Sequence, residues 1–198
     1  SEAGGSSTFT VALLSEPTSG VTISLNSSDY TEGLSSPGSI VFTDKNWNTA
    51  MTVTVTGVND NVDDDEIDYN IFVSSSSNDP TYSVLSDASV SVTNSDDDVA
   101  GYTVSGTSGL VTTEAGGDAA VTIVLQSEPT ADVYIVLTSA DATEGLPYAD
   151  SLRFTAGTWE TPQDIRLIGQ NDYVDEGDIA YTVAGVPRSN DTKYNDLS

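Results

Sequence analysis

Two short stretches of the chain are much richer in carboxylates than the residues around them. They are Gly57–Asp68, with the sequence GVNDNVDDDEID, and Gly169–Asp178, with the sequence GQNDYVDEGD. Two carboxylates held about 4–5 Å apart repel each other by about 3–4 kcal/mol at an effective dielectric constant of about 20. A hard divalent cation with oxygen ligands turns that repulsion into binding energy. The pattern therefore predicts two loops that are either fully hydrated or able to hold a cation.

The overall charge narrows the range of partners. The 198 residues carry a net charge of −26 and include only 5 Lys and Arg. Nucleic-acid binding requires Lys and Arg at the phosphates, so we expect no nucleic-acid partner. Attraction to anionic lipid is disfavoured for the same reason, and no apolar run has membrane-spanning length, so we expect no direct membrane insertion of this segment. A solvated acidic surface explains part of the charge but not its clustering at the same place twice.

Several kinds of chemistry are excluded by missing residue types. The chain contains neither Cys nor His. Disulfides, thiolate chemistry, zinc sites of the usual kind and Ser-His-Asp triads are therefore absent. The DxDxDG loop of an EF-hand is absent as well.

The chain contains an internal duplication. Ser1–Gly33 aligns with Thr113–Gly145, and the offset of about 112 residues holds without a gap to the C-terminus, with roughly two in five positions identical. The matched pairs include Phe42 with Phe154, Trp47 with Trp159, Asn59-Asp60 with Asn171-Asp172, and Tyr69 with Tyr181. Each acidic loop therefore belongs to one copy of a repeated unit.

The register of the duplication sets the expected domains, residues 1–98 and residues 99–198. The first copy has no counterpart of the opening segment Gly101–Thr112, which includes two short strand-like pieces. The second copy has no counterpart of the alternating segment Asp87–Val92 that closes the first. We therefore expect the first domain to lack its first strand and the second its last strand, as in a window cut from a longer array.

Apolar residues alternate with Ser and Thr along both copies, which predicts strands with one face in the core and one in water. Turn residues separate about six or seven such segments per copy, and no stretch has helical periodicity. The expected fold is all-β, two tandem immunoglobulin-like antiparallel β-sandwiches of Greek-key type. Trp47 and Trp159 precede strands and are expected to cap the cores. The expected core contains Phe9, Val11, Leu13, Val53, Val55, Tyr69, Ile71 and their counterparts in the second copy.

Several motifs occur in the same order in both copies. EAGG opens each copy, SDYTEG or SADATEG follows, and then come F-T, a Trp followed by N-T or E-T, and the acidic loop. In this combination essentially the whole chain resembles the Calx-beta repeat of sodium–calcium exchangers, integrin β4 and very large bacterial surface proteins. The resemblance implies sandwiches of about seven strands, with Ca²⁺ as the cofactor at one tip.

The resemblance also implies a set of metal ligands for each copy. For the first copy these are Glu2, Asp29, Asn59, Asp60, the carbonyl of Val62, Asp64, Asp96, Asp97 and Asp98. For the second copy these are Glu114, Asp141, Asn171, Asp172, the carbonyl of Val174 and Glu176. Asp63 and Asp175 are additional candidates. Asn59 and Asn171 stand where calcium-binding members often have Asp, which predicts weaker binding, and the second set lacks a closing Asp cluster.

Three functions fit the sequence. The first is a non-enzymatic calcium-binding structural repeat of a large extracellular or cell-surface protein, a rod segment in adhesion that calcium stiffens and whose partners are neighbouring repeats of the same chain. The second is a self-assembling matrix, sheath or filament component in which copies of the chain pack together. The third is a carbohydrate-binding module. Paired carboxylates can also hydrolyse glycosides, but here the acidic residues repeat with the fold rather than forming one pair in an aromatic-lined cleft, so we expect no enzyme.

Overall fold

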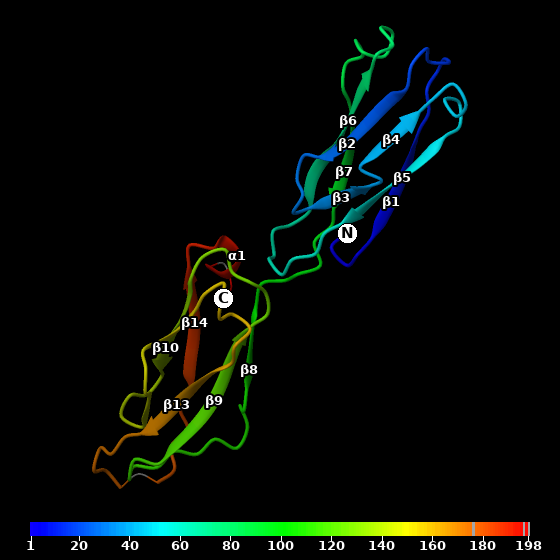
Figure 1. The fold of residues 1–198 in the computed structure, drawn as a ribbon. Coiled ribbons are helices and arrows are strands. Elements are labelled where there is room, and N and C mark those ends of the chain that lie inside the picture. The colour runs from blue at the N-terminus through cyan, green and yellow to red at the C-terminus, as the bar shows by residue number, and fades with distance from the viewer. Residues whose placement is uncertain (176, 196, 198) are drawn as a thin grey trace. The chain divides into compact units, whose positions relative to one another are not determined.

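The computed structural model describes residues 1–175, 177–195 and 197. It contains two compact units. The first unit comprises Ser1–Asp60 and Asp64–Asp97, and the second comprises Asn61–Asp63 and Asp98–Ser198. Each unit consists of two antiparallel sheets (Figure 1), which confirms the predicted all-β fold of tandem β-sandwiches. No helix among the described residues is long and apolar enough to cross a membrane.

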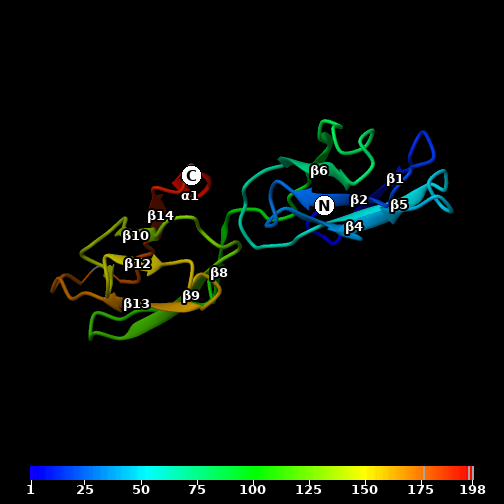
Figure 2. The same ribbon diagram turned by 45° about the horizontal axis from the view of Figure 1, so that its top comes forward.

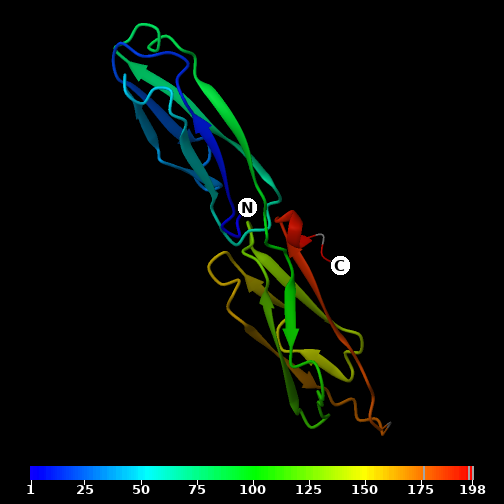
Figure 3. The same cartoon turned by 90° about the vertical axis from the view of Figure 1, so that its right-hand side faces the viewer.

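The first unit has a sheet of three strands and a sheet of four. The first sheet has the order β1 (Ser6–Val11), β5 (Met51–Gly57) and β3 (Gly33–Ser36). The second has the order β4 (Ser39–Phe42), β2 (Val21–Ser27), β6 (Ile67–Ser77) and β7 (Ala88–Asn94). Figure 3 shows these strands from another side. Because β7 pairs with the start of β6, Asn94 lies opposite Ile67, where the acidic loop ends.

The core of the first unit follows the period-two pattern of its strands. Val53, Val55 and Ile71 are buried as predicted, with Leu13 and Tyr69 beside them. Phe9 and Val11 pack against this core but are only partly buried, because β1 is an edge strand. The predicted burial is therefore correct for the interior strands and too high for the edge strand β1.

The second unit repeats this arrangement with one strand gained and one absent. Its sheets have the orders β11-β13-β9-β8 and β12-β10-β14, which form the two layers seen in Figure 2. The strands are β8 (Tyr102–Ser105), β9 (Asp118–Leu125), β10 (Val133–Ser139), β11 (Gly145–Pro147), β12 (Ser151–Phe154), β13 (Gln163–Gly169) and β14 (Val183–Ser189), and a short helix α1 (Thr192–Asn195) follows. Ile123, Leu125, Ile165 and Leu167 are buried as predicted. Tyr181 precedes β14 and is only partly buried.

Three local expectations differ from the structure. Of the two strand-like pieces expected between residues 101 and 112, only β8 forms a strand. The sequence does not predict the strands β3 and β11. Each is short and begins at a Gly, a residue type that is common in turns. They form through pairing with β5 and β13, which a local pattern does not reveal. Trp47 and Trp159 pack partly buried against the two cores, as expected.

The duplication extends to individual hydrogen bonds. The hydroxyl of Tyr82 donates to the carbonyl of Ser15 at 2.6 Å, and the hydroxyl of Tyr194 donates to the carbonyl of Ser127 at 2.6 Å. Each bond starts from the segment that follows β6 or β14, which is a loop in the first unit and helix α1 in the second, and ends at the turn after β1 or β9. The two copies therefore share the same polar clasp at one end of the sandwich.

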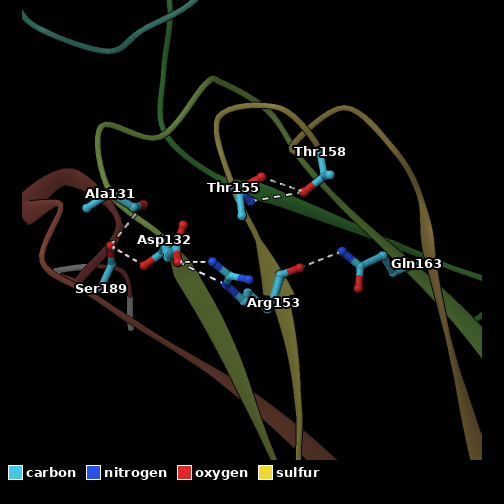
Figure 4. A network of polar contacts seen from close by, with 7 residues as sticks. All are labelled: Ala131, Asp132, Arg153, Thr155, Thr158, Gln163 and Ser189. Carbon is cyan, nitrogen blue, oxygen red and sulfur yellow. Dashed lines mark hydrogen bonds and ion pairs between the residues drawn. The ribbon is translucent and has the colours of Figure 1, made fainter.

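A polar network closes the same end of the second unit (Figure 4). Arg153 Nε and Nη2 both donate to Asp132 Oδ2, at 2.9 and 2.6 Å. Gln163 Nε2 donates to the carbonyl of Arg153 at 2.8 Å, and Ser189 Oγ donates to the carbonyl of Asp132 at 2.9 Å. The Arg153–Asp132 pair is exposed, so its contribution to stability is about 0–1 kcal/mol. The network joins strands rather than forming a site.

Candidate metal centre

Four segments of the first unit meet at the end of the sandwich where the acidic loop lies. The loop leaves β5 at Gly57 and enters β6 of the other sheet at Ile67. The N-terminal segment joins it because Glu2 N donates to the carbonyl of Ser95 at 3.0 Å. The turn before β3 joins it because Val58 N donates to the carbonyl of Glu32 at 3.0 Å.

Carboxylates from these segments converge. Oxygen atoms of Glu32, Asp60 and Asp64 all lie within 4.8 Å of one another, and oxygen atoms of Glu2 and Asp60 are equally close. Glu2 is only 2% exposed and Glu32 only 5%. The centre is therefore a buried acidic group that can hold a metal ion.

The electrostatic cost of this arrangement is visible in two pKa shifts. Burial, followed by the charges of Asp60, Asp96 and Asp64, raises the pKa of Glu2 from 4.5 to about 7. Burial and the charge of Glu32 also raise the pKa of Asp64 above its ordinary value. Both shifts mean that the ionised centre lacks sufficient positive charge or hydrogen bonding of its own.

Asn94 joins the two most buried carboxylates. Its Nδ2 donates to Glu2 Oε1 and to Glu32 Oε2, each at 3.3 Å, and to the carbonyl of Val58 at 3.0 Å. The side chain is 1% exposed. Its Nδ2 therefore donates to both carboxylates and to one backbone carbonyl, while its Oδ1 lies beside Gly57.

Three buried oxygen atoms have no hydrogen-bond partner among the described residues. They are Glu2 Oε2, Asp64 Oδ1 and Asn94 Oδ1. A buried polar atom without a partner costs about 1–3 kcal/mol, and more when it is charged. All three are acceptors, and calcium takes about 6–8 oxygen ligands of this kind. The residues present therefore fit a metal ion that takes oxygen ligands.

Gly57 leaves room for this geometry. A Cβ atom at this position would collide with Asn94 Oδ1 and with the carbonyl oxygen of Ser1. Any side chain at residue 57 would thus displace one of the unpartnered oxygens. The glycine at the start of the acidic loop is a requirement of the centre.

Two other predicted ligands of the first copy, Asp96 and Asp29, accept hydrogen bonds within the loops around the centre. Asp96 Oδ2 accepts hydrogen bonds from the backbone of Asp64 and Asp65, both at 3.1 Å, and so shapes the loop. Asp29 Oδ1 accepts from Thr31 N at 3.0 Å and from its hydroxyl at 2.6 Å, which lowers the pKa of Asp29 and fixes the turn that carries Glu32. Asp29 does not belong to the carboxylate group found among the described residues.

The remaining predicted residues lie around the loop. Asn59 and Asp97 are exposed, Val62 is partly buried, and Asn59 Nδ2 donates to the carbonyl of Asp60. Asp63 and Asp98 belong to the second unit.

Both oxygens of Asp63 are used in that unit. Oδ1 accepts from Lys193 Nζ at 2.6 Å, and Oδ2 accepts from Ala100 N at 2.8 Å. Burial alone would raise the pKa of Asp63, but these two donors lower it.

The second acidic loop is arranged differently. Glu114 and Asp175 are exposed, and Asp141 Oδ1 caps Thr143 as Asp29 caps Thr31. Asn171 and Asp172 accept hydrogen bonds from the backbone of Tyr173 and Val174, at 2.9 Å each. Glu176 lies outside the described residues. Within the described part of this loop, no three carboxylates come together.

Sequence reasoning missed two residues of the centre, Glu32 and Asn94. Glu32 belongs to the duplicated T-E-G motif, and its counterpart Glu144 accepts from Gln170 N as Glu32 accepts from Val58 N. Asn94 follows Val90 and Val92 at the same period of two, which places it on the inward face of β7. A polar residue at an inward position was the available signal.

Comparison with protein-family models gives no match, and no curated protein matches the chain. The chain therefore consists of two antiparallel β-sandwich units of about 100 residues each, with a buried acidic centre that can hold a metal ion.

Proposed function

We propose that the chain is a calcium-binding structural repeat of a large extracellular or cell-surface protein, of the Calx-beta type that its motifs resemble. The observation that carries the proposal is the set of three unpartnered buried oxygens on Glu2, Asp64 and Asn94. They lie beside the carboxylates of Glu32 and Asp60, so several negative charges share this end of the unit. A bound ion would satisfy the oxygens and the charge together.

Calcium suits the centre better than other common metals. All available ligand atoms are oxygens, and the chain has no His or Cys to favour zinc. Magnesium demands near-ideal octahedral geometry and dehydrates reluctantly, whereas calcium tolerates irregular sets of carboxylate, amide and carbonyl oxygens. Extracellular modules bind calcium with dissociation constants of about 10⁻⁴–10⁻³ M, which fits a centre partly built from an amide.

The proposed role of the ion is mechanical. Asp96 and Asp97 end the first unit, and only the residues from Asp98 to Gly101 precede β8 of the second. A linker of this length does not behave as a flexible coil. Ordering of the acidic loop by calcium would therefore restrict movement between neighbouring repeats, which are the proposed partners. The acidic residues have no catalytic role in this proposal.

The test is calcium titration by isothermal calorimetry, comparing the wild-type chain with Glu32→Gln and Asp64→Asn. Both substitutions keep the side-chain size and remove a charge, so calcium affinity should fall at least about tenfold in each. Asp87→Asn is the matched control, because Asp87 is exposed at the opposite end of β7. Absence of a calcium heat in the wild type, or equal affinity in all variants, would contradict the proposal.

A further inference from the structure

The second unit carries a hollow on the outer face of its larger sheet, separate from the acidic loops. Its volume is about 370 Å³, near the lower end of the range for small-molecule sites. Alternation along β9 and β13 turns Asp118, Ala120, Asp164 and Arg166 outward. The connection from β11 to β12 supplies Tyr148 and Ala149, β12 supplies Leu152, and β13 also contributes Ile165 to the remaining wall.

The polar side chains around the hollow hold one another in place. Arg166 Nε donates to Asp118 Oδ2 at 2.8 Å, and the Arg166 guanidinium lies 5.8 Å from the centre of the Tyr148 ring. Tyr148 N also donates to the carbonyl of Arg166 at 2.8 Å. On the other side, Asp164 Oδ1 accepts from the hydroxyl of Thr122 at 2.7 Å. Tyr148 nevertheless keeps 73% of its surface exposed to solvent, so its ring is accessible to a ligand.

The internal duplication shows that the fold does not require these side chains. The positions of Asp118, Tyr148, Asp164 and Arg166 are occupied in the first copy by Ser6, Ser36, Thr52 and Thr54. The strands β1 and β5 pair as β9 and β13 do, with small hydroxyl residues alone. An exposed ion pair such as Arg166–Asp118 adds only about 0–1 kcal/mol to stability. The charged and aromatic residues of the hollow are therefore free to serve a ligand.

We propose that this hollow binds a neutral sugar unit of an oligosaccharide or polysaccharide. The accessible ring of Tyr148 offers an apolar face to the C–H groups of a pyranose. Asp118 and Asp164 accept hydrogen bonds from sugar hydroxyls, and Arg166 donates to them. Two carboxylates against one guanidinium give the hollow a net negative charge, which disfavours anionic ligands. A cationic ligand would meet Arg166, which already occupies the space near the Tyr148 ring.

The proposal is independent of the metal centre and gives the carbohydrate-binding alternative a specific site. The carboxylates in the acidic loops repeat with the fold, which argued against glycoside hydrolysis but left glycan binding open. Asp118 and Asp164 do not repeat, and they lie beside an exposed aromatic ring. The inference concerns binding and includes no bond cleavage.

The test is isothermal calorimetry of the whole chain with maltohexaose, cellohexaose, laminarihexaose and xylohexaose at millimolar concentrations. At least one should bind saturably, and Tyr148→Ala and Asp164→Asn should each weaken that binding by about tenfold or more. Tyr173→Ala is the matched control, because Tyr173 is 91% exposed in the same unit and does not line the hollow. Circular dichroism of each variant verifies that the fold is retained.

Several outcomes would overturn the proposal. These are absence of binding to all four oligosaccharides, binding that Tyr148→Ala leaves unchanged, or equal loss in the Tyr173→Ala control. Binding of polygalacturonate or of a lysine oligomer that is stronger than that of any neutral sugar and that Tyr148→Ala weakens would also overturn it, since either would assign the hollow to a charged ligand.

Discussion

The side-chain amide of Asn94, at the end of β7, donates to Glu32 Oε2 at 3.3 Å across the gap between the two sheets of the first unit. Glu32 directly precedes β3 of one sheet, and β7 belongs to the other. The hydrogen bond therefore joins the sheets at their acidic end. It also partly offsets the repulsion between Glu32 and Glu2, which accepts from the same nitrogen.

The first prediction concerns this amide. Asn94→Ala removes the donor that Glu2 Oε1, Glu32 Oε2 and the Val58 carbonyl share, so the free energy of unfolding should fall by about 1–3 kcal/mol. Urea unfolding with and without calcium measures the effect, and calcium should restore only part of the loss because Asn94 Oδ1 is also gone. Asn26→Ala is the control, since Asn26 is exposed on β2. Equal losses in the two variants would contradict the assigned role of Asn94.

The second prediction concerns pH. The pKa of Glu2 rises from 4.5 to about 7 on folding, chiefly through burial. The folded state then binds more protons than the unfolded state between these values, so the stability contributed by the protonated group is lost as pH rises from about 4.5 through about 7. Asp64 shifts in the same direction. In the presence of chelator, the protein should therefore be more stable near pH 5 than near pH 7.5, as measured by urea unfolding.

Two comparisons isolate the cause of this pH dependence. Glu2→Gln should flatten the stability profile between about pH 5 and about pH 7.5, because the substituted side chain does not titrate. Calcium should reverse the slope in the wild type, since the ion replaces a proton and binds more tightly at higher pH. The lowered pKa values of Asp29, Asp79 and Asp141 act in the opposite sense, because stability is lost as pH falls through the acidic range, below the window in question. An unchanged slope in Glu2→Gln would contradict the prediction.

The third prediction concerns the space that Gly57 leaves open. Gly57→Ala should destabilise the chain by about 1–3 kcal/mol and weaken calcium binding, because the added Cβ collides with Asn94 Oδ1 and the Ser1 carbonyl. Gly38→Ala is the matched control, since a Cβ at that position meets nothing within 4 Å. Thermal unfolding and calcium titration of both variants measure the two effects. A Gly57→Ala protein that binds calcium like the wild type would show that the centre lies elsewhere.

The fourth prediction concerns the proposed mechanical role. Small-angle X-ray scattering should give a narrower distribution of distances between the two units with calcium than with chelator. Replacing Asp97 and Asp98 by Ala should broaden the distribution while leaving both sandwiches folded, because neither residue belongs to a core. A distribution that ignores calcium and both substitutions would reject the stiffened rod. A calcium-dependent increase in molecular mass would instead favour the matrix or filament role.

Much of the fold was predictable from short-range patterns. Alternation in Val21, Ile23 and Leu25 indicates the inward face of β2, and the same pattern recurs in β10. Strand β3, in contrast, has four residues and depends on its pairing with β5, so its own sequence carries little information. The same holds for β11 of the second unit, which depends on its pairing with β13.

The acidic loop was predictable, but the contributions of its neighbours were only partly so. The resemblance implies Asp29 as a ligand, and the structure shows that its Oδ1 caps Thr31, a local hydrogen bond that the D-x-T spacing allows. Asn94 and Glu32 reach the centre through the pairing of distant strands. The hollow of the second unit combines Asp118, Tyr148 and Arg166 from three separate segments, so no local motif marks it.

The clasp between Tyr82 and Ser15 has a consequence for how the first unit loses structure. Ser15 follows β1 and Glu2 precedes it, so the clasp and the acidic centre lie at opposite ends of that strand. The clasp consists of neutral groups and should not respond to calcium, whereas the acidic end should. On calcium removal, fraying should begin at the acidic end and stop short of the clasp. Hydrogen exchange should then accelerate at the amides of Gly5 and Gly57 while those of Leu13 and Ser15 keep their protection.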